Sequence, residues 1–139
     1  EPEIVGREVE VGVLQYPDGC LIASVPALLK GIDDSDEGFY GFETKYLDNV
    51  VTAQIPAPFS EDITAQLRDM AIRAFEALNC SGLSRVDFFV TEAGLYINEV
   101  NTLPGFTPIS MYPQVLAASD VDYPTLLEVL IVSAQARTA

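Results

Sequence analysis

The stretch that decides the fold reads SRVDFFVTEAGLYINEVN and runs from Ser84 to Asn101. It holds two strand-like segments, residues 84–91 and 95–101, on either side of the short linker Glu92-Ala93-Gly94, which is typical of an antiparallel hairpin. A three-residue hairpin loop usually ends in a left-handed residue, a conformation that glycine adopts without strain. We therefore expect two paired strands joined by a three-residue loop that ends at Gly94.

This loop length fixes which residues face each other across the hairpin. The expected pairs are Thr91 with Leu95, Asp87 with Glu99, and Arg85 with Asn101. Two carboxylates roughly 5 Å apart repel each other unless a proton or a cation lies between them. Oxygen ligands of this kind suit Mg²⁺, which completes its coordination with substrate phosphates. The hairpin thus predicts a divalent-cation site on Asp87, Glu99 and Asn101, with Arg85 placed to meet a phosphate.

Two alternatives weigh against this site. A two-residue turn at Ala93-Gly94 would shift the register and put Asp87 opposite Val100. Asp87 and Glu99 could also be solvated strand residues that Arg85 neutralises. The segment 102–113 favours the metal site, because it is too rich in Gly and Pro for a strand or helix and too apolar for an idle surface loop. A loop of this kind beside a metal-binding face often carries a substrate.

The remaining elements surround this hairpin. Residues 5–15 alternate as a strand with one apolar face, and Glu8 and Glu10 share the other face. A turn over Tyr16–Gly19 leads into a returning strand at residues 20–23. Ser60 is a suitable N-cap for a helix, and a shorter helix is expected near residues 112–119. The apolar stripe of the first helix comprises Ile63, Leu67, Met70, Ala71, Ala74, Phe75 and Leu78, and a last helix from Pro124 carries Leu126, Leu127, Leu130, Ile131 and Ala134.

Composition excludes several classes of protein. The 139 residues contain 7 Lys and Arg, 21 Asp and Glu and no His, and 49% of them are hydrophobic. This apolar content rules out disorder for most of the chain, and the charge disfavours nucleic acid and anionic membranes as partners. No apolar run is long enough to span a membrane and no signal peptide is evident, so we expect a cytoplasmic protein. Cys20 and Cys80 form no zinc motif and are expected to be free thiols.

Five motifs in order resemble the D-alanine-D-alanine ligases, which are ATP-grasp enzymes of peptidoglycan synthesis. They are Gly6-Arg7-Glu8, residues 39–46 with Lys45-Tyr46, residues 85–89, residues 98–107, and residues 109–113. The match runs across essentially all 139 residues. It implies an α+β fold, the ATP-grasp C-terminal domain, with a mainly antiparallel sheet flanked by helices. Residues 1–139 would include the end of the central lid domain, and the N-terminal domain would lie outside this chain.

The resemblance also implies roles for individual residues. Asp87, Glu99 and Asn101 look like the ligands of two Mg²⁺ or Mn²⁺ ions on the phosphates of ATP. Glu8 matches the residue that binds the ribose hydroxyls, and Lys45 resembles a phosphate-contacting lysine. The remaining roles concern catalysis and the second substrate: Arg85 and the Gly105 backbone N–H for the oxyanion, Ser110 and the Met111 backbone for the second D-alanine carboxylate, and Tyr46 for closing the site.

The reaction that the resemblance implies is the ATP-dependent joining of two D-alanines through an acylphosphate, by an enzyme that is a homodimer when complete. The isolated 139 residues are expected to be nearly inactive. A D-alanine-D-lactate ligase is an alternative, although Lys45-Tyr46 resembles the dipeptide-forming type. Gly41 and Phe42 depart from the Asp and Tyr that relatives often have. A non-catalytic nucleotide-binding domain is a second alternative, which the presence of Arg85 and the three metal-ligand matches disfavours.

Overall fold

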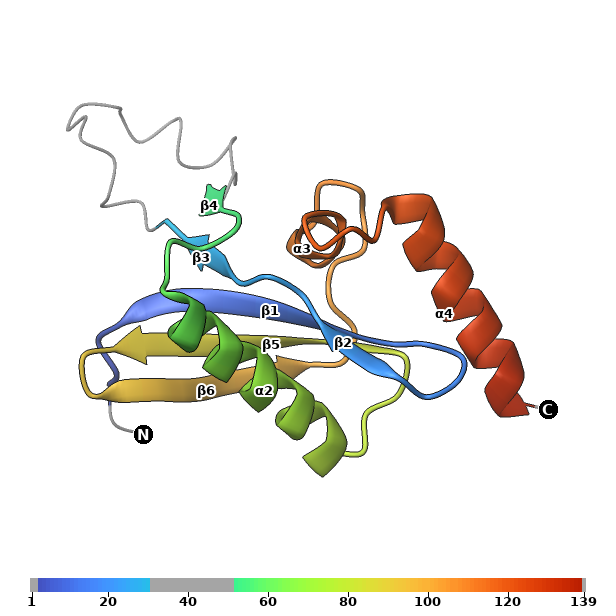
Figure 1. Cartoon of the computed structure of the whole chain (residues 1–139), viewed down its shortest axis with the longest axis horizontal. Helices are drawn as coiled ribbons and strands as arrows, with labels where there is room; N and C mark the ends of the chain where they lie inside the picture. Colours follow the sequence, from blue (N-terminus) through green and yellow to red (C-terminus); the bar gives the residue numbers. More distant parts are fainter. Residues whose placement is uncertain (1–2, 31–51, 139) are drawn as a thin grey trace.

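The computed structural model describes residues 3–30 and 52–138, which form a twisted sheet with helices on both faces (Figure 1). The strands are β1 (Arg7–Gln15), β2 (Leu21–Ala23), β3 (Ala27–Leu29), β4 (Ala53–Gln54), β5 (Leu83–Thr91) and β6 (Gly94–Asn101). Their order is β4-β3-β1-β5-β6, with β2 also paired to β1, and each of these pairings is antiparallel. The predicted α+β class is confirmed.

Helix α2 (Glu61–Ala77) covers one face of the sheet. The Ser60 side chain accepts a hydrogen bond of 3.3 Å from the Ile63 backbone N–H, as expected of an N-cap. The first hydrophobic core joins the valines of β1 to this helix: Val9, Val11, Val13, Leu67, Ala71, Phe75, Val86, Phe88 and Val90. The predicted stripe is correct except at Leu78, which follows the last helical residue and is 61% exposed.

Among the described residues, helices α3 (Met111–Ala117) and α4 (Tyr123–Thr138) cover one end of the opposite face. Leu14 of β1 lies in this second core with Tyr112 and Leu116 of α3. A Cβ at Gly12 would lie 2.6 Å from the Leu116 Cδ2 atom, so the absence of a side chain allows α3 to approach β1 closely. The Tyr112 hydroxyl donates a hydrogen bond of 2.9 Å to the Val13 carbonyl.

The last helix forms as predicted, but only some of its apolar residues are buried. Leu126, Val129 and Ser133 are buried, whereas Leu127 and Ile131 are 38% and 58% exposed. The apolar residues of this helix are distributed around nearly its whole circumference, so their spacing in the sequence does not define one apolar face. The packing of α4 against α3 and β1 therefore selects its buried face.

The β5–β6 hairpin has the predicted register near the predicted metal ligands but not at its turn. Thr91 pairs with Gly94 rather than with Leu95, so the loop is Glu92-Ala93, one residue shorter than expected. An irregularity next to Asp87 adds Asn98 to β6 and restores the register. Asp87 consequently faces Glu99 and Arg85 faces Asn101, as predicted. The alternative that placed Asp87 opposite Val100 is wrong.

Several smaller expectations are also confirmed. The Gly19 backbone N–H closes the predicted turn by donating to the Tyr16 carbonyl at 2.9 Å. Cys20 and Cys80 are free thiols. Among the helices of the described ranges, none has the length and apolar character needed to cross a bilayer.

Candidate metal and nucleotide site

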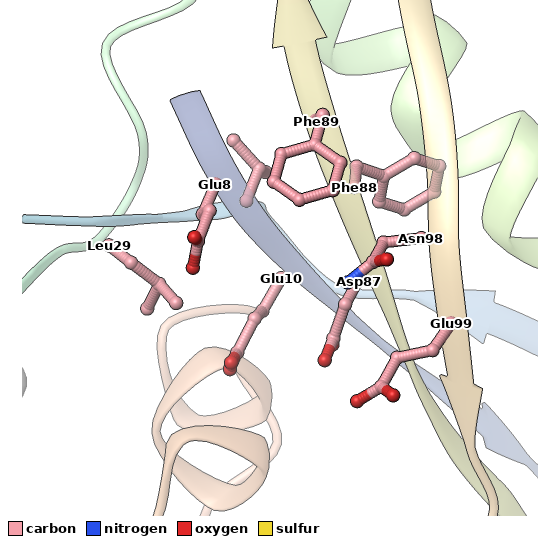
Figure 2. A pocket seen from close by; sticks show the side chains of 9 residues that line it. Glu8, Glu10, Leu29, Asp87, Phe88, Phe89, Asn98 and Glu99 are labelled. Atoms are coloured by element: carbon pink, nitrogen blue, oxygen red, sulfur yellow. The ribbon is translucent and has the colours of Figure 1, made fainter. Parts of the chain in front are cut away.

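The end of the sheet face that α3 and α4 leave uncovered carries a pocket lined mainly by polar side chains. Residues from adjacent strands line it: Glu8 and Glu10 of β1, Asp87 and Phe89 of β5, Asn98 and Glu99 of β6, and Leu29 of β3. Figure 2 shows the carboxylates of Glu10, Asp87 and Glu99 pointing toward the same side. This pocket contains two of the three predicted metal ligands.

Strand register places these carboxylates in a row. Glu10 faces Asp87 across β1 and β5, and Asp87 faces Glu99 across β5 and β6. Opposed side chains lie on the same face of a sheet, so the predicted pair of carboxylates is in fact a row of three. The bulge contributes to this row, because without the extra residue Asn98 the shorter turn would move Glu99 out of line with Asp87.

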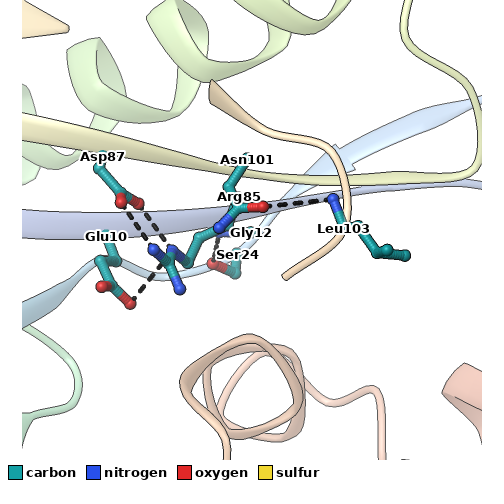
Figure 3. Close-up of polar contacts among 7 residues, drawn as sticks. All are labelled: Glu10, Gly12, Ser24, Arg85, Asp87, Asn101 and Leu103. Carbon is teal, nitrogen blue, oxygen red and sulfur yellow. Dashed lines mark hydrogen bonds and ion pairs between the residues drawn. The ribbon is translucent and has the colours of Figure 1, made fainter. Parts of the chain in front are cut away.

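Arg85 is the cation that balances this row (Figure 3). Its Nε and Nη2 atoms each donate a hydrogen bond of 2.7 Å to Asp87, one to each carboxylate oxygen. The same Nε atom lies 3.5 Å from Oε2 of Glu10. The hydrogen bond to Asp87 raises the pKa of the Arg85 guanidinium, which is therefore charged at any physiological pH.

Glu10 is the functional candidate that the sequence reasoning placed on this face without giving it a role. The residue is 8% exposed, and its Oε2 atom has no hydrogen-bond partner. Burial raises the pKa of its carboxyl to about 7; Arg85 opposes this shift, and the carboxylates of Asp87, Glu8 and Glu99 add to it. Its position two residues after Glu8, on the same polar face of the predicted strand, was the signal available in the sequence.

Asn101 and Glu99 complete the predicted ligand set. The Asn101 Oδ1 atom accepts a hydrogen bond of 3.3 Å from the Leu103 backbone N–H, and Glu99 is exposed to solvent. Within residues 3–30 and 52–138, no three His, Cys, Asp or Glu residues are grouped closely enough to hold a metal by themselves. The oxygen donors nevertheless fit Mg²⁺ or Mn²⁺, which commonly take one or two carboxylates and complete their coordination with phosphates and water.

The loop after β6 brings together Gly105, predicted to stabilise the oxyanion, and Ser110, predicted to hold the second substrate. A Cβ on Gly105 would lie 3.1 Å from the Ser110 hydroxyl, so the two residues are neighbours. That hydroxyl lies 2.7 Å from the Thr107 hydroxyl and accepts a 3.1 Å hydrogen bond from the Thr107 backbone N–H. Ser110 precedes α3 but makes no side-chain capping bond. The polar contacts of its side chain therefore stay within the loop, while its carbonyl accepts a hydrogen bond of 3.3 Å from the Gln114 backbone N–H of α3.

Phe106 anchors this loop to the second core. Its ring lies between those of Tyr112 and Tyr123, with centroids 6.0 Å and 5.8 Å away. Its carbonyl accepts a hydrogen bond of 2.8 Å from the Tyr123 hydroxyl. The loop that begins directly after Asn101 is therefore tied at its centre to α3 and α4, and Met111 starts α3.

Comparison with known protein families identifies the chain. Residues 1–132 match the family model described as "D-ala D-ala ligase C-terminus". The chain belongs to this family. The resemblance stated from the five motifs is thus confirmed over nearly the whole sequence.

Curated relatives in this family are considerably longer than the chain. A D-alanine--D-alanine ligase of Corynebacterium efficiens is 60% identical over 139 residues, which are all of this chain and 38% of that protein. A ligase of the same name from Corynebacterium aurimucosum is 64% identical over 138 residues, covering 99% of the chain and 39% of the relative. The chain spans less than two fifths of the length of these relatives.

Solved structures of the family share this fold. The D-alanine-D-alanine ligase from Coxiella burnetii superposes with a TM-score of 0.77 at 37% identity, covering 99% of this chain and 35% of that one. The VanG D-Ala:D-Ser ligase from Enterococcus faecalis gives a TM-score of 0.76 at 32% identity, covering 96% of this chain and 37% of that one. The predicted ATP-grasp C-terminal fold is therefore confirmed.

Of the other residues that were matched to the family, one lies at the pocket and the rest lie outside the described residues. Glu8, matched to the ribose-binding residue, is exposed at the edge of the pocket beside Glu10. Lys45 and Tyr46 lie outside the described residues, as do Gly41 and Phe42. Their predicted roles stay predictions.

Proposed function

We propose that this chain is the C-terminal ATP-grasp portion of an ATP-dependent ligase that joins two D-alanine molecules for peptidoglycan synthesis in the cytoplasm. The observation that carries this proposal is the pairing of Asp87 with Glu99 beside the Arg85 guanidinium, in a chain of the D-alanine ligase family. Residues 1–139 include the end of the central lid domain, and the N-terminal domain belongs to a part of the protein outside this chain. The complete enzyme is a homodimer.

Asp87, Glu99 and Asn101 would hold two Mg²⁺ or Mn²⁺ ions that bind together with the phosphates of ATP. The support for this is chemical, since two carboxylates and an amide oxygen from facing strands match the ligand preference of hard divalent cations. Ions held by these residues would supply positive charge that neutralises and orients the phosphoryl oxygens. Glu8 at the pocket edge binds the ribose hydroxyls, Lys45 contacts a phosphate, and Tyr46 helps to close the site.

The first chemical step transfers the γ-phosphoryl group to the carboxylate of one D-alanine. A carboxylate oxygen attacks phosphorus, the bond to the β-phosphate oxygen breaks, and ADP leaves with the electron pair. Arg85 neutralises negative charge that spreads over the transferred group. Its position on β5, between β1 and β6, with burial of all but 19% of its side chain, supports this role.

The second step forms the peptide bond. The amine of a second D-alanine attacks the acylphosphate carbonyl, and a tetrahedral oxyanion forms before phosphate leaves and the amine proton is lost. Arg85 and the Gly105 backbone N–H stabilise this oxyanion, each donor contributing about 3 kcal/mol. Ser110 and the Met111 backbone hold the second carboxylate, and the close approach of Gly105 and Ser110 supports their joint action.

The test is ADP release by the complete protein that contains these residues. Release is measured with Mg²⁺ and D-alanine, and with L-alanine as the matched control, and the product is identified by mass. The proposal predicts ADP release with D-alanine only and formation of D-alanyl-D-alanine. The absence of D-alanine-dependent release would contradict it and favour a non-catalytic nucleotide-binding domain.

A ligase with another acceptor is the second candidate, because the VanG D-Ala:D-Ser ligase shares this fold at 32% identity. D-Alanine with D-lactate and D-alanine with D-serine are therefore added as further reactions. A mixed product formed in preference to the dipeptide would establish the alternative acceptor. Exclusive formation of the dipeptide would support the assignment made here.

A further inference from the structure

Arg85 and Asp87 have conflicting tasks in the proposed site. Both Asp87 oxygens accept hydrogen bonds from Arg85 at 2.7 Å. A divalent cation on Asp87 would share the carboxylate with the positively charged guanidinium, and like charges at such short distance repel strongly. Binding of the cation therefore requires Arg85 to leave Asp87 at least in part.

Glu10 is placed to accept Arg85 when it leaves. Its Oε2 atom lies 3.5 Å from the Arg85 Nε atom, is buried, and has no hydrogen-bond partner. Glu10 faces Asp87 directly across β1 and β5, so the guanidinium lies between two carboxylates (Figure 3). Among the described residues, Arg85 is the only Lys or Arg within 4.0 Å of Glu10.

We propose that Glu10 is a positioning residue for Arg85, which exchanges Asp87 for Glu10 when the nucleotide–metal complex occupies Asp87. This inference rests on the proposed function. The exchange keeps Arg85 in the site, frees the Asp87 oxygens for the cation, and turns the 3.5 Å ion pair with Glu10 into the hydrogen bond that the buried Glu10 oxygen lacks. Loss of the Glu10 charge would leave Arg85 bound to Asp87 and in competition with the cation.

The test measures cation binding in the absence of turnover. Mn²⁺ binding to the complete protein with ADP is followed by the electron paramagnetic resonance signal of free Mn²⁺. The inference predicts that Glu10→Gln raises the Mn²⁺ dissociation constant about 10-fold, as is typical for the loss of a group that supports a metal ligand. Glu76→Gln on α2 removes the same charge from an exposed position outside the pocket and should match the wild type.

Two more variants separate positioning from space filling and from direct ligation. Glu10→Asp keeps the charge but shortens the side chain, so it should bind Mn²⁺ more tightly than Glu10→Gln; a space-filling role predicts the reverse order. In an Arg85→Ala background, Glu10→Gln should change the dissociation constant by less than about 2-fold, because the residue through which Glu10 acts is absent.

Two outcomes would overturn the inference while leaving the proposed function intact. One is wild-type Mn²⁺ affinity in Glu10→Gln. The other is an equal loss of affinity with and without Arg85, which would make Glu10 a direct cation ligand. The wild-type protein could also bind Mn²⁺ in the presence of ADP but form no ADP from ATP when D-alanine is supplied. That result would contradict the proposed function alone.

Discussion

The two ends of one face of the sheet differ in whether their buried polar groups have hydrogen-bond partners. We call the end beneath α3 the packed end and the end that carries Glu10 the polar end. At one end, Gly12 and Leu14 lie beneath α3, and the buried Tyr112 hydroxyl has a partner in the Val13 carbonyl. At the other end, the same strand presents Glu10, whose buried oxygen lacks a hydrogen-bond partner. Burial of an unpaired polar group destabilises a fold by about 1–3 kcal/mol. The packed end therefore stabilises the domain, whereas the polar end keeps a buried oxygen whose contact with Arg85 is a 3.5 Å ion pair.

The largest effect is expected at the polar end, in catalysis. Arg85→Ala should lower the turnover of the complete enzyme by about 10²–10³-fold, because one donor to the reacting charges is lost. The measurement is ADP release with D-alanine at saturating Mg²⁺. Arg73→Ala, which removes a guanidinium from the exposed surface of α2, is the control and should leave turnover unchanged. Unchanged turnover in Arg85→Ala would contradict a role of Arg85, and so of the polar end, in catalysis.

At the packed end, the largest effect is expected in stability. Leu116→Ala should destabilise the domain by about 2–5 kcal/mol, because this fully buried side chain fills the contact between α3 and β1. Urea unfolding measures the change. Ile131→Ala on the exposed side of α4 is the control, with an expected effect within about 0.5 kcal/mol. Equal effects of the two substitutions would show that α3 does not pack as described.

The Glu10 carboxyl is expected to make the stability of the domain depend on pH. Its pKa is raised from 4.5 to about 7, so the folded protein favours the protonated carboxyl. Protonation of Glu10 therefore contributes about 3 kcal/mol to the free energy of unfolding. This contribution is fully present below pH 4.5 and is lost as the pH rises through 7. Glu10→Gln, which is always neutral, should lack this loss and be the more stable protein at pH 8.

Unfolding free energies at pH 4.5, 6 and 8 measure this difference. Glu128→Gln, an exposed change of the same kind on α4, should keep the pH dependence of the wild type. If Glu10→Gln also kept it, the Glu10 carboxyl would not be the group that titrates. Greater stability combined with weaker Mn²⁺ binding would show that the polar end sacrifices stability for cation binding.

The smallest effect is expected on the other face of the sheet. Ser60→Ala should destabilise the domain by about 1 kcal/mol, because the Ile63 N–H loses its capping partner. Thermal unfolding measures the change, and turnover should stay at the wild-type level. A large loss of turnover would indicate that α2 also acts on the site.

Local patterns in the sequence predicted most of the fold. Alternation in residues 5–15 and the cap at Ser60 were enough to place β1 and α2, because each depends on neighbouring residues. The buried face of α4 was not predictable, since it depends on contacts with α3 and β1 that spacing does not encode. The hairpin shows a mixture: the turn was predicted one residue too long, and the bulge at Asn98 restored the predicted pairing of Asp87 with Glu99.

The site was predictable only where its residues share a hairpin. Asp87 and Glu99 lie on adjacent strands with a short connection, so their pairing followed from the sequence. The pairing of Glu10 with Asp87 joins strands that are distant in the sequence, and only the folded sheet shows it. The unpartnered oxygen of Glu10 depends on burial, which the alternating pattern of β1 did not indicate for its polar face.

The location of bound Mn²⁺ is the most direct test of the proposal that Asp87, Glu99 and Asn101 bind the cation. Crystals of the complete protein with ADP and Mn²⁺ would locate the ion by its anomalous scattering. We expect an anomalous peak between the side-chain oxygens of Asp87, Glu99 and Asn101, with the Arg85 guanidinium turned toward Glu10. Mn²⁺ bound to the nucleotide away from these three residues would contradict it.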